Sequence, residues 1–178
     1  MGVSVIASAG RRTIFDRMLG AALLEPETYE EAAVASSVWT QAALVVVLSS
    51  VAAGVGNLGG GLTGFVLGFL GALLGWGLCA LAAYWAATRK FGVPRAETTW
   101  SATLRVLGFA STPRLFLVFT FLPAIGFLVG LAVHAWTLIT MTFAIKPALD
   151  LETRPAILVA LAGWLPMLLV WVIAAIVV

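Results

Sequence analysis

Arg114 and His134 are the residues whose types and spacing could do chemistry within the apolar part of this chain. They lie at similar distances on either side of the segment Pro123–Gly126, so a straight hairpin would bring them to the same depth. No acidic residue occurs in the apolar stretches to neutralise Arg114. One hypothesis is therefore a polar site for an anion such as a lipid phosphate, with Thr112 or Thr137 nearby.

A simpler interpretation of the same pair is structural, and on the sequence alone we favour it. An arginine in the middle of a span costs roughly 2.5–3.5 kcal/mol on insertion scales. Arg114 could avoid that cost by extending its long side chain to the membrane surface. His134 would then be a neutral, hydrogen-bonded interior histidine.

Most catalytic arrangements are excluded by residue counts. One histidine and one cysteine, Cys79, cannot form the usual zinc sites or an intrachain disulfide. Asp16 and Asp150 both lie in polar segments, so an intramembrane aspartate pair is not expected. Neither a nucleotide-binding loop nor a basic nucleic-acid-binding patch is present. We expect no catalytic residue, no metal, no cofactor, no nucleic-acid partner and no enzymatic activity.

The composition indicates that lipid is the solvent for most of the surface. Of 178 residues, 62% are hydrophobic and only 10% are charged, and the mean hydropathy is +1.08. So few charged residues cannot cover a water-soluble globule of this size. The sequence predicts an all-α, polytopic membrane protein whose first partner is the bilayer.

Five membrane-spanning helices are predicted, and the division of 103–145 decides that number. A single helix over this block would run about 64 Å, twice the thickness of the hydrocarbon layer. Pro123 and Gly126 lie near its middle and are turn residues. The predicted spans are 35–53, 62–88, 103–122, 125–145 and 156–178, forming a membrane domain 34–178 after an N-terminal segment 1–33.

The distribution of basic residues predicts the orientation. With five spans, the N-terminal segment and the connections 89–100 and 146–155 lie on one side and hold most of the arginines and lysines, while the opposite turns hold no charge. The positive-inside rule then places the N-terminus in the cytoplasm and the C-terminus outside. The composition is compatible with a bacterial cytoplasmic (inner) membrane.

Two segments near the predicted cytoplasmic face have less regular patterns. Residues 13–24 carry an apolar stripe with Asp16 and Arg17 off it, which predicts a helix lying in the membrane interface. Residues 25–31 read as an acidic, solvated connection. The segment 99–114 is expected to be partly interfacial or kinked at Pro113.

Five glycines of the second span fall on one helical face. Such a face allows a neighbouring backbone to approach closely, as in small-xxx-small association. We expect internal helix packing, with a dimer seam or a conduit as alternatives. The glycines are Gly60, Gly64, Gly68, Gly71 and Gly75.

Several segments together resemble the Yip family of small membrane proteins. They are TWSATLRVLGFASTPRLF at Thr99–Phe116, FLPAIGFLVGLAVHAWTLIT at Phe121–Thr140 and AIKPALDLETRPAILVALAGWL at Ala144–Leu165. The LLEPETYEE segment before the first span is also similar to the family's N-terminal entry.

The resemblance implies five spans, a cytosolic N-terminus and a non-enzymatic role in organising membranes or binding partners or lipids. Eukaryotic members bind Rab-type GTPases and carry longer cytosolic N-terminal regions, whereas this chain is similar to the short bacterial members. Membrane-protein partners or a homo-oligomer are possible. The alternative function is a small transporter or lipid-translocating protein that uses the glycine face and Arg114.

Overall fold

A computed structural model of the chain describes residues 12–93 and 99–177, and these residues form helices joined by short connections. The all-α prediction is confirmed for this part of the chain. The α-helices and the 3₁₀ segments η1 to η3 are, in order, α2 (Ile14–Ala22), α3 (Pro26–Val34), η1 (Ser36–Val38), α4 (Trp39–Gly56), η2 (Leu58–Gly60), α5 (Gly61–Lys90), α6 (Trp100–Ala110), η3 (Thr112–Phe121), α7 (Gly126–Leu149) and α8 (Thr153–Val177).

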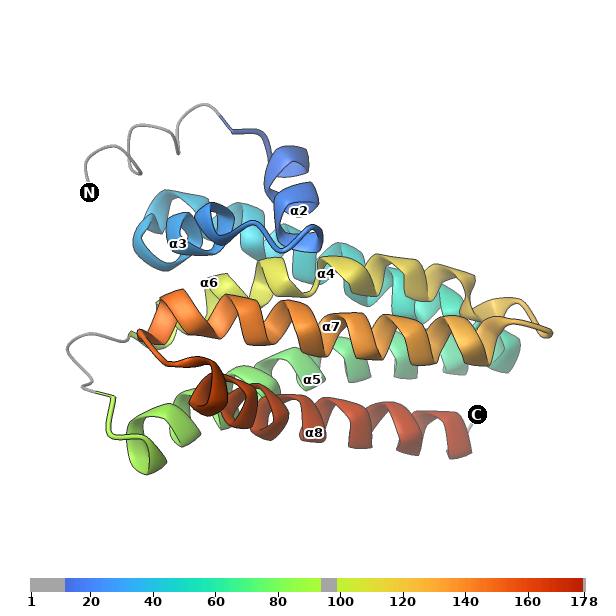
Figure 1. Ribbon diagram of the computed structural model, residues 1–178. Coiled ribbons are helices and arrows are strands. Elements are labelled where there is room, and N and C mark those ends of the chain that lie inside the picture. Colours follow the sequence, from blue (N-terminus) through green and yellow to red (C-terminus); the bar gives the residue numbers. More distant parts are fainter. Residues whose placement is uncertain (1–11, 94–98, 178) are drawn as a thin grey trace.

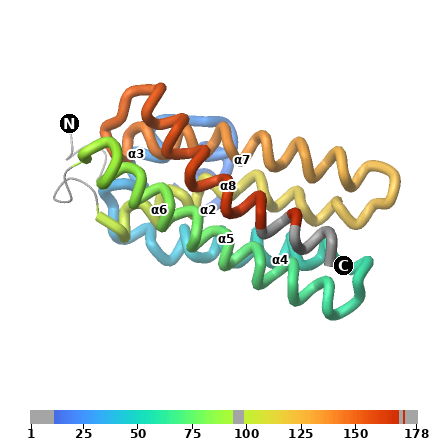
Figure 2. The backbone as a smooth tube through the Cα atoms, turned by 90° about the horizontal axis from the view of Figure 1, so that it is seen from below, coloured from blue at the N-terminus to red at the C-terminus, as the bar shows by residue number. Residues whose placement is uncertain are grey.

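The long helices form a bundle in which successive legs alternate in direction. α4, the α6–η3 pair and α8 run one way, and α5 and α7 run back (Figures 1 and 2). The connection after α5 and the connection after α7 therefore lie at the end of the bundle where α4 begins. The η2 turn and the η3–α7 turn lie at the opposite end, near the end of α8.

Helix length and composition support several membrane crossings. Three helices of the described chain are long and apolar enough to cross a membrane, namely Ser36–Gly56, Leu58–Lys90 and Gly126–Leu149. A fourth arises if α6 and η3, which are bent by 46° relative to each other, form one broken span. The part of α8 included in this test, Thr153–Leu169, is apolar but shorter. A fifth crossing stays a prediction.

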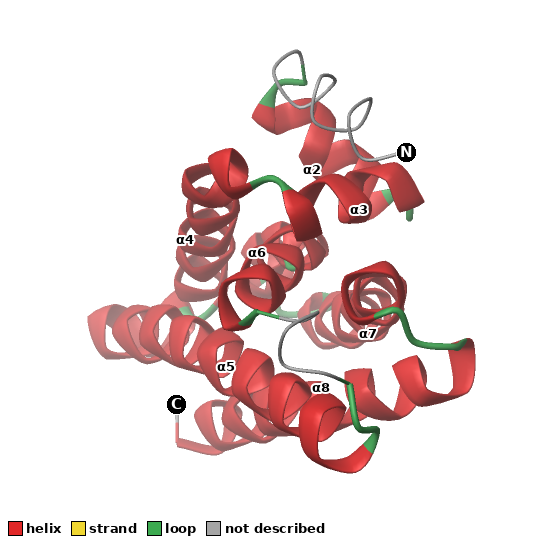
Figure 3. Ribbon diagram, turned by 90° about the vertical axis from the view of Figure 1, so that its left-hand side faces the viewer, coloured by secondary structure: helices red, strands yellow, loops and turns green. Residues whose placement is uncertain are grey.

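α6 lies in the centre of the bundle, surrounded by α4, α5, α7 and the two N-terminal helices (Figure 3). Every residue from Arg105 to Ala110 is buried. Its contact with α4 is especially close, because a methyl group added to Gly108 would lie 3.1 Å from the Ala42 carbonyl oxygen. α2 and α3 cover the side of α6 that α4 and α7 leave open.

The segment between α2 and α4 differs from the sequence prediction. Residues 25–31 are not a solvated connection: Pro26, an acceptable first-turn residue, begins α3, and Tyr29 and Glu31 are buried. α2 begins at a capping box in which Thr13 accepts from the backbone N–H of Asp16.

The contacts of α2 also differ from those expected of a helix lying alone on the membrane surface. α2 packs on α6, η3 and α7, and Arg17, which the sequence placed off the buried stripe, is buried. The reason is that Arg17 has polar partners in α3 and α4, which a pattern based on hydrophobicity does not detect. An interfacial position for α2 stays a prediction.

The glycines of α5 lie against two different neighbours. A methyl group at Gly68 would lie 2.7 Å from the Ala53 carbonyl oxygen in α4, and one at Gly75 would lie 3.4 Å from the Cγ of Met167 in α8. Gly64 is also buried, whereas Gly60 belongs to the η2 turn rather than to α5. These contacts are within the chain, which favours internal packing.

Substituting Gly68 by alanine tests this packing. Overpacking of this kind costs about 1–3 kcal/mol, so we expect Gly68→Ala to lower the free energy of unfolding measured in detergent. Gly77, in the same helix, has no atom within 4 Å of an added methyl group. The control Gly77→Ala should leave stability unchanged or raise it slightly, through better helix propensity. Equal stabilities for the two variants would contradict the close α4–α5 contact.

The direction of α8 can be tested with terminal reporters. If the chain crosses the membrane five times, a reporter fused after Val178 is accessible only from outside the cell, and one fused before Met1 only from the cytoplasm. Protease protection in intact spheroplasts measures both. A cytoplasmic reporter at both ends would show an even number of crossings.

Candidate functional site: a buried cavity at Arg114

The break between α6 and η3 places Arg114 inside the bundle. α6 ends at Ala110, and Pro113 lies in the first turn of η3, where its missing N–H costs nothing. The backbone N–H of Arg114 donates to the Ser111 carbonyl oxygen at 3.0 Å, which closes the turn. Because the chain bends by 46° at this point, the Arg114 side chain lies between helices.

Arg114 does not extend to the membrane surface. It is only 5% exposed, and its Nη2 donates weakly to the Ala72 carbonyl oxygen of α5, at 3.4 Å. Its Nη1 is buried and has no hydrogen-bond partner within the part of the chain that the structure describes. The surface-extended arrangement favoured on the sequence alone is therefore wrong, since the bend leaves this side chain enclosed by α5 and its neighbours.

Arg114 and His134 both line a small cavity. The cavity has a volume of about 30 Å³ and is lined by residues of α4, α5, η3, α7 and α8, and by the α4–α5 turn. The lining residues are Ala53, Asn57, Leu67, Gly68, Gly71, Ala72, Arg114, Leu117, Thr120, His134 and Met167.

The polar lining differs in part from the sequence hypothesis. Thr112 and Thr137 do not line the cavity; their hydroxyls donate to carbonyl oxygens of nearby residues in the chain. Asn57 and Thr120 line it instead. The sequence offered little signal for them, because Asn57 falls in a glycine-rich turn and Thr120 in an apolar run that ends at the next turn.

His134 is held by its own helix and by α8. Its Nδ1 lies 2.8 Å from the Gly130 carbonyl oxygen. Because a carbonyl oxygen only accepts, this contact assigns the proton to Nδ1. The backbone carbonyl of His134 accepts from the indole N–H of Trp164 at 3.2 Å. These bonds fix the imidazole beside the cavity.

The chemistry available at this site is electrostatic. The lining supplies a guanidinium, an amide, a hydroxyl and an imidazole, but no carboxylate and no thiol. Among the described residues no group of His, Cys, Asp and Glu side chains could hold a metal ion. The arrangement suits an anion bound by N–H donors.

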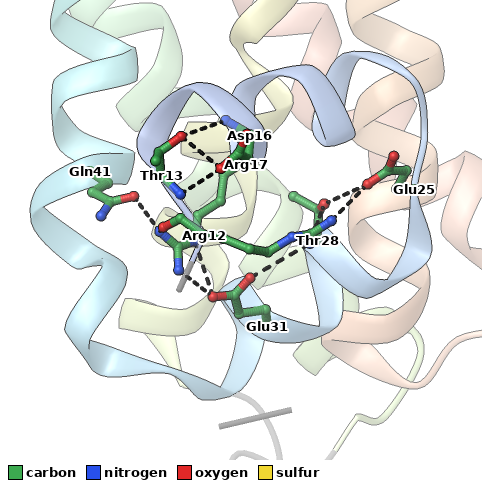
Figure 4. A network of polar contacts seen from close by, with 8 residues as sticks. All are labelled: Arg12, Thr13, Asp16, Arg17, Glu25, Thr28, Glu31 and Gln41. Atoms are coloured by element: carbon green, nitrogen blue, oxygen red, sulfur yellow. Dashed lines mark hydrogen bonds and ion pairs between the residues drawn. The ribbon is translucent and has the colours of Figure 1, made fainter. Parts of the chain in front are cut away.

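A second polar cluster, which sequence reasoning missed, joins the N-terminal helices to α4 (Figure 4). The Nε of Arg17 donates to Glu31 Oε1 at 3.0 Å, and its Nη1 donates to Gln41 Oε1 at 2.7 Å. Arg12 forms an ion pair with Glu25 at 2.9 Å and lies 3.7 Å from Glu31. The sequence feature that could have predicted this cluster is the presence of both basic and acidic residues, at helical spacings, within residues 12–41.

The ends of α2 and α3 are closed by side chains from other elements. Arg105 in α6 donates to the Ala32 and Ala33 carbonyl oxygens in the last turn of α3, at 2.9 and 2.8 Å. The Tyr29 hydroxyl donates to the Ala21 carbonyl oxygen at 2.6 Å. Cations and donors at a helix C-terminus satisfy its free carbonyls, so these contacts fix the N-terminal helices to the bundle.

Two groups in the N-terminal helices have shifted pKa values. The hydrogen bonds from the Thr13 side chain and backbone lower the pKa of Asp16, which keeps its carboxylate ionised at the start of α2. Burial raises the pKa of the Tyr29 hydroxyl, which keeps it protonated and donating.

Comparison with known proteins identifies one family. A model of the Yip1 domain matches residues 13–174, which covers both the cavity and the N-terminal helices. Searches for similar curated proteins and for similar solved structures found no match.

Replacing Glu31 by glutamine tests the N-terminal cluster. Removing one partner of a buried ion pair costs about 3–5 kcal/mol, because the other charge is left uncompensated. We expect Glu31→Gln to expose residues 12–34 to proteolysis and to faster hydrogen exchange. Glu30, which is exposed, provides the matched control Glu30→Gln, which should leave both unchanged. Equal protection in the two variants would show that the pair does not hold α2 and α3 in place.

Proposed function

The chain belongs to the Yip1 domain family of multi-pass membrane proteins, and we propose that it organises the surrounding bilayer without catalysis. In this proposal it acts as a wedge in one leaflet. The observation that supports this most directly is the position of α2 and α3. They lie on the half of the bundle in which α6 begins and leave the other half uncovered (Figure 1). The molecule is therefore wider at one end.

The outward face of α2 is suited to lipid. Phe15 and Leu19 lie one helical turn apart and Leu23 follows them; Phe15 and Leu23 are 68% and 63% exposed. Transfer of each such side chain from water into lipid contributes about 1.5–3 kcal/mol. Water contact along this face would be costly, whereas acyl chains would cover it.

The apolar face of α2 is continuous with the lipid-facing surface of the bundle. The indole N–H of Trp136, near the middle of α7, donates to the Ala22 carbonyl oxygen at the end of α2 at 3.1 Å. The Trp136 ring stacks on Phe116 at 5.7 Å, and Phe116 is exposed. The end of α2 is thus level with the middle of a membrane helix, which supports insertion into the leaflet.

The distribution of basic residues supports a cytoplasmic location for this wedge, by the positive-inside rule. Additional protein volume in one leaflet favours a membrane that curves away from that side. In this proposal the protein resides in a bacterial cytoplasmic membrane and acts on local membrane shape, either alone or with membrane-protein partners.

Reconstitution into vesicles of mixed diameter tests the wedge. We expect the density of labelled protein per membrane area to rise as vesicle diameter falls, as measured by fluorescence microscopy of single vesicles. The double variant Phe15→Ser, Leu19→Ser should lose most of this preference, because its outward face no longer favours lipid. The matched control Phe15→Leu, Leu19→Met keeps that face apolar and should retain the preference. Equal density at all diameters for the unaltered protein would refute the proposal.

Transport is a second candidate function, and the cavity beside the buried Arg114 is the observation that favours it. A transported anion or lipid phosphate would pair with Arg114 between α5 and η3. Liposomes containing the protein would then release an anion or exchange labelled lipid between leaflets, and Arg114→Gln would reduce that rate. The wedge function predicts neither flux.

A further inference from the structure

The Arg114 guanidinium carries a charge that the surrounding protein does not neutralise. The ion pairs found within the described residues all involve Arg12 or Arg17 in the N-terminal region. No residue lining the cavity is acidic. Arg114 has one weak hydrogen bond, at 3.4 Å, and its buried Nη1 has none in the described chain.

The burial of the Arg114 charge is therefore not compensated by partners within the described chain. A charge taken out of water costs several kcal/mol even after the surrounding protein relaxes, and it is tolerated when a counter-charge and hydrogen bonds compensate it. Arg105 shows how this chain satisfies a buried guanidinium: all three of its nitrogens donate, to Ala32, Ala33 and Ser101. Arg114 lacks such a set, although both arginines are only 5% exposed.

The cavity supplies space and a second donor. The centre of a water-sized particle can move within about 30 Å³ of this cavity, so there is room for a small ion together with water. One N–H of the Asn57 amide donates to the Ala53 carbonyl oxygen at 2.7 Å. An amide carries two N–H donors, so the second is available to a ligand.

Charge defines the class of ligand. No acidic residue lines the cavity and a cation would be repelled by Arg114, so the ligand is an anion. Gly68 and Gly71 form part of the wall, where a side chain would reduce the space. We propose that the cavity binds one small monovalent inorganic anion, such as chloride, on the Nη1 of Arg114 and the Asn57 amide.

The bound anion neutralises Arg114 and joins η3 to α4 and the α4–α5 turn. This role is independent of the wedge proposed for α2 and α3, which lies on another side of α6. It predicts that stability depends on the kind of anion rather than on ionic strength alone.

Thermal unfolding of the purified full chain in detergent tests the proposal. Sodium chloride is compared with sodium gluconate at equal ionic strength, since gluconate is a far bulkier anion than chloride. At a chloride concentration ten times Kd, binding to the folded state shifts the folding equilibrium roughly elevenfold, which raises Tm by about 3–6 °C. The increase should saturate with chloride and should also occur with bromide.

Two variants locate the effect. Arg114→Gln removes the charge and should abolish the difference between chloride and gluconate. Arg154→Gln removes an exposed arginine and should retain it. Equal Tm values in the two salts for the unaltered protein, or an undiminished chloride effect in Arg114→Gln, would overturn the proposal.

A measurement on the unaltered protein covers the case in which Arg114→Gln does not fold. Crystals grown in bromide should give an anomalous scattering peak beside Arg114 Nη1. Density for water without an anomalous peak would refute anion binding. Phosphorus retained stoichiometrically by the purified protein, with lipid density entering the cavity, would instead identify a lipid phosphate as the ligand and would also overturn the inorganic-anion proposal.

Discussion

The enclosure of α6 is the constraint on which the rest of this structure depends. A helix surrounded by protein inside a membrane can use neither water nor lipid headgroups to satisfy its polar side chains. Arg105 is therefore paired with the carbonyl oxygens at the end of α3, and Gly108 allows α4 to approach closely. The Arg105 contact requires α3, which helps to complete the wall between α4 and α7.

The two arginines on either side of the bend serve different purposes. Arg105 stabilises the fold directly, since its donors close a helix that would otherwise end with free carbonyls. Arg114 follows the bend and faces a cavity, where one nitrogen has no partner within the described chain. Arg105 thus links α6 to α3, whereas Arg114 leaves one N–H donor unsatisfied beside the cavity.

Close helix contacts would give the proposed wedge a rigid support. Gly68 lies against α4, Gly75 against α8, and the Gly163 position of α8 lies close to the Cys79 carbonyl oxygen of α5. In lipid, such contacts replace the hydrophobic effect as the source of helix association. A rigid bundle with additional helices at one end can transmit its shape to the bilayer, whereas a loosely packed one would adapt to it.

The sequence by itself determined the class of protein, the family and most of the helical legs. Hydropathy and the placement of charge are one-dimensional properties, and they predict spans over 35–53, 62–88 and 125–145. The structure has helices over 36–56, 58–90 and 126–149 that are long and apolar enough to cross a membrane. The segment over 103–122 was expected to be irregular at Pro113, and the chain bends there. The family pattern over 13–174 agrees with the resemblance seen in the residues.

Only the tertiary structure decided which polar residues are buried. Glu31 and Arg17 looked like solvated charges, and Arg114 like a side chain that reaches the surface, because a sequence does not show which groups will face one another. Asn57 and Thr120 line the cavity only because α4, η3 and α5 converge there. Local sequence determines where a helix can form in lipid, but the partner of a buried charge comes from a distant segment, and packing alone brings the two together.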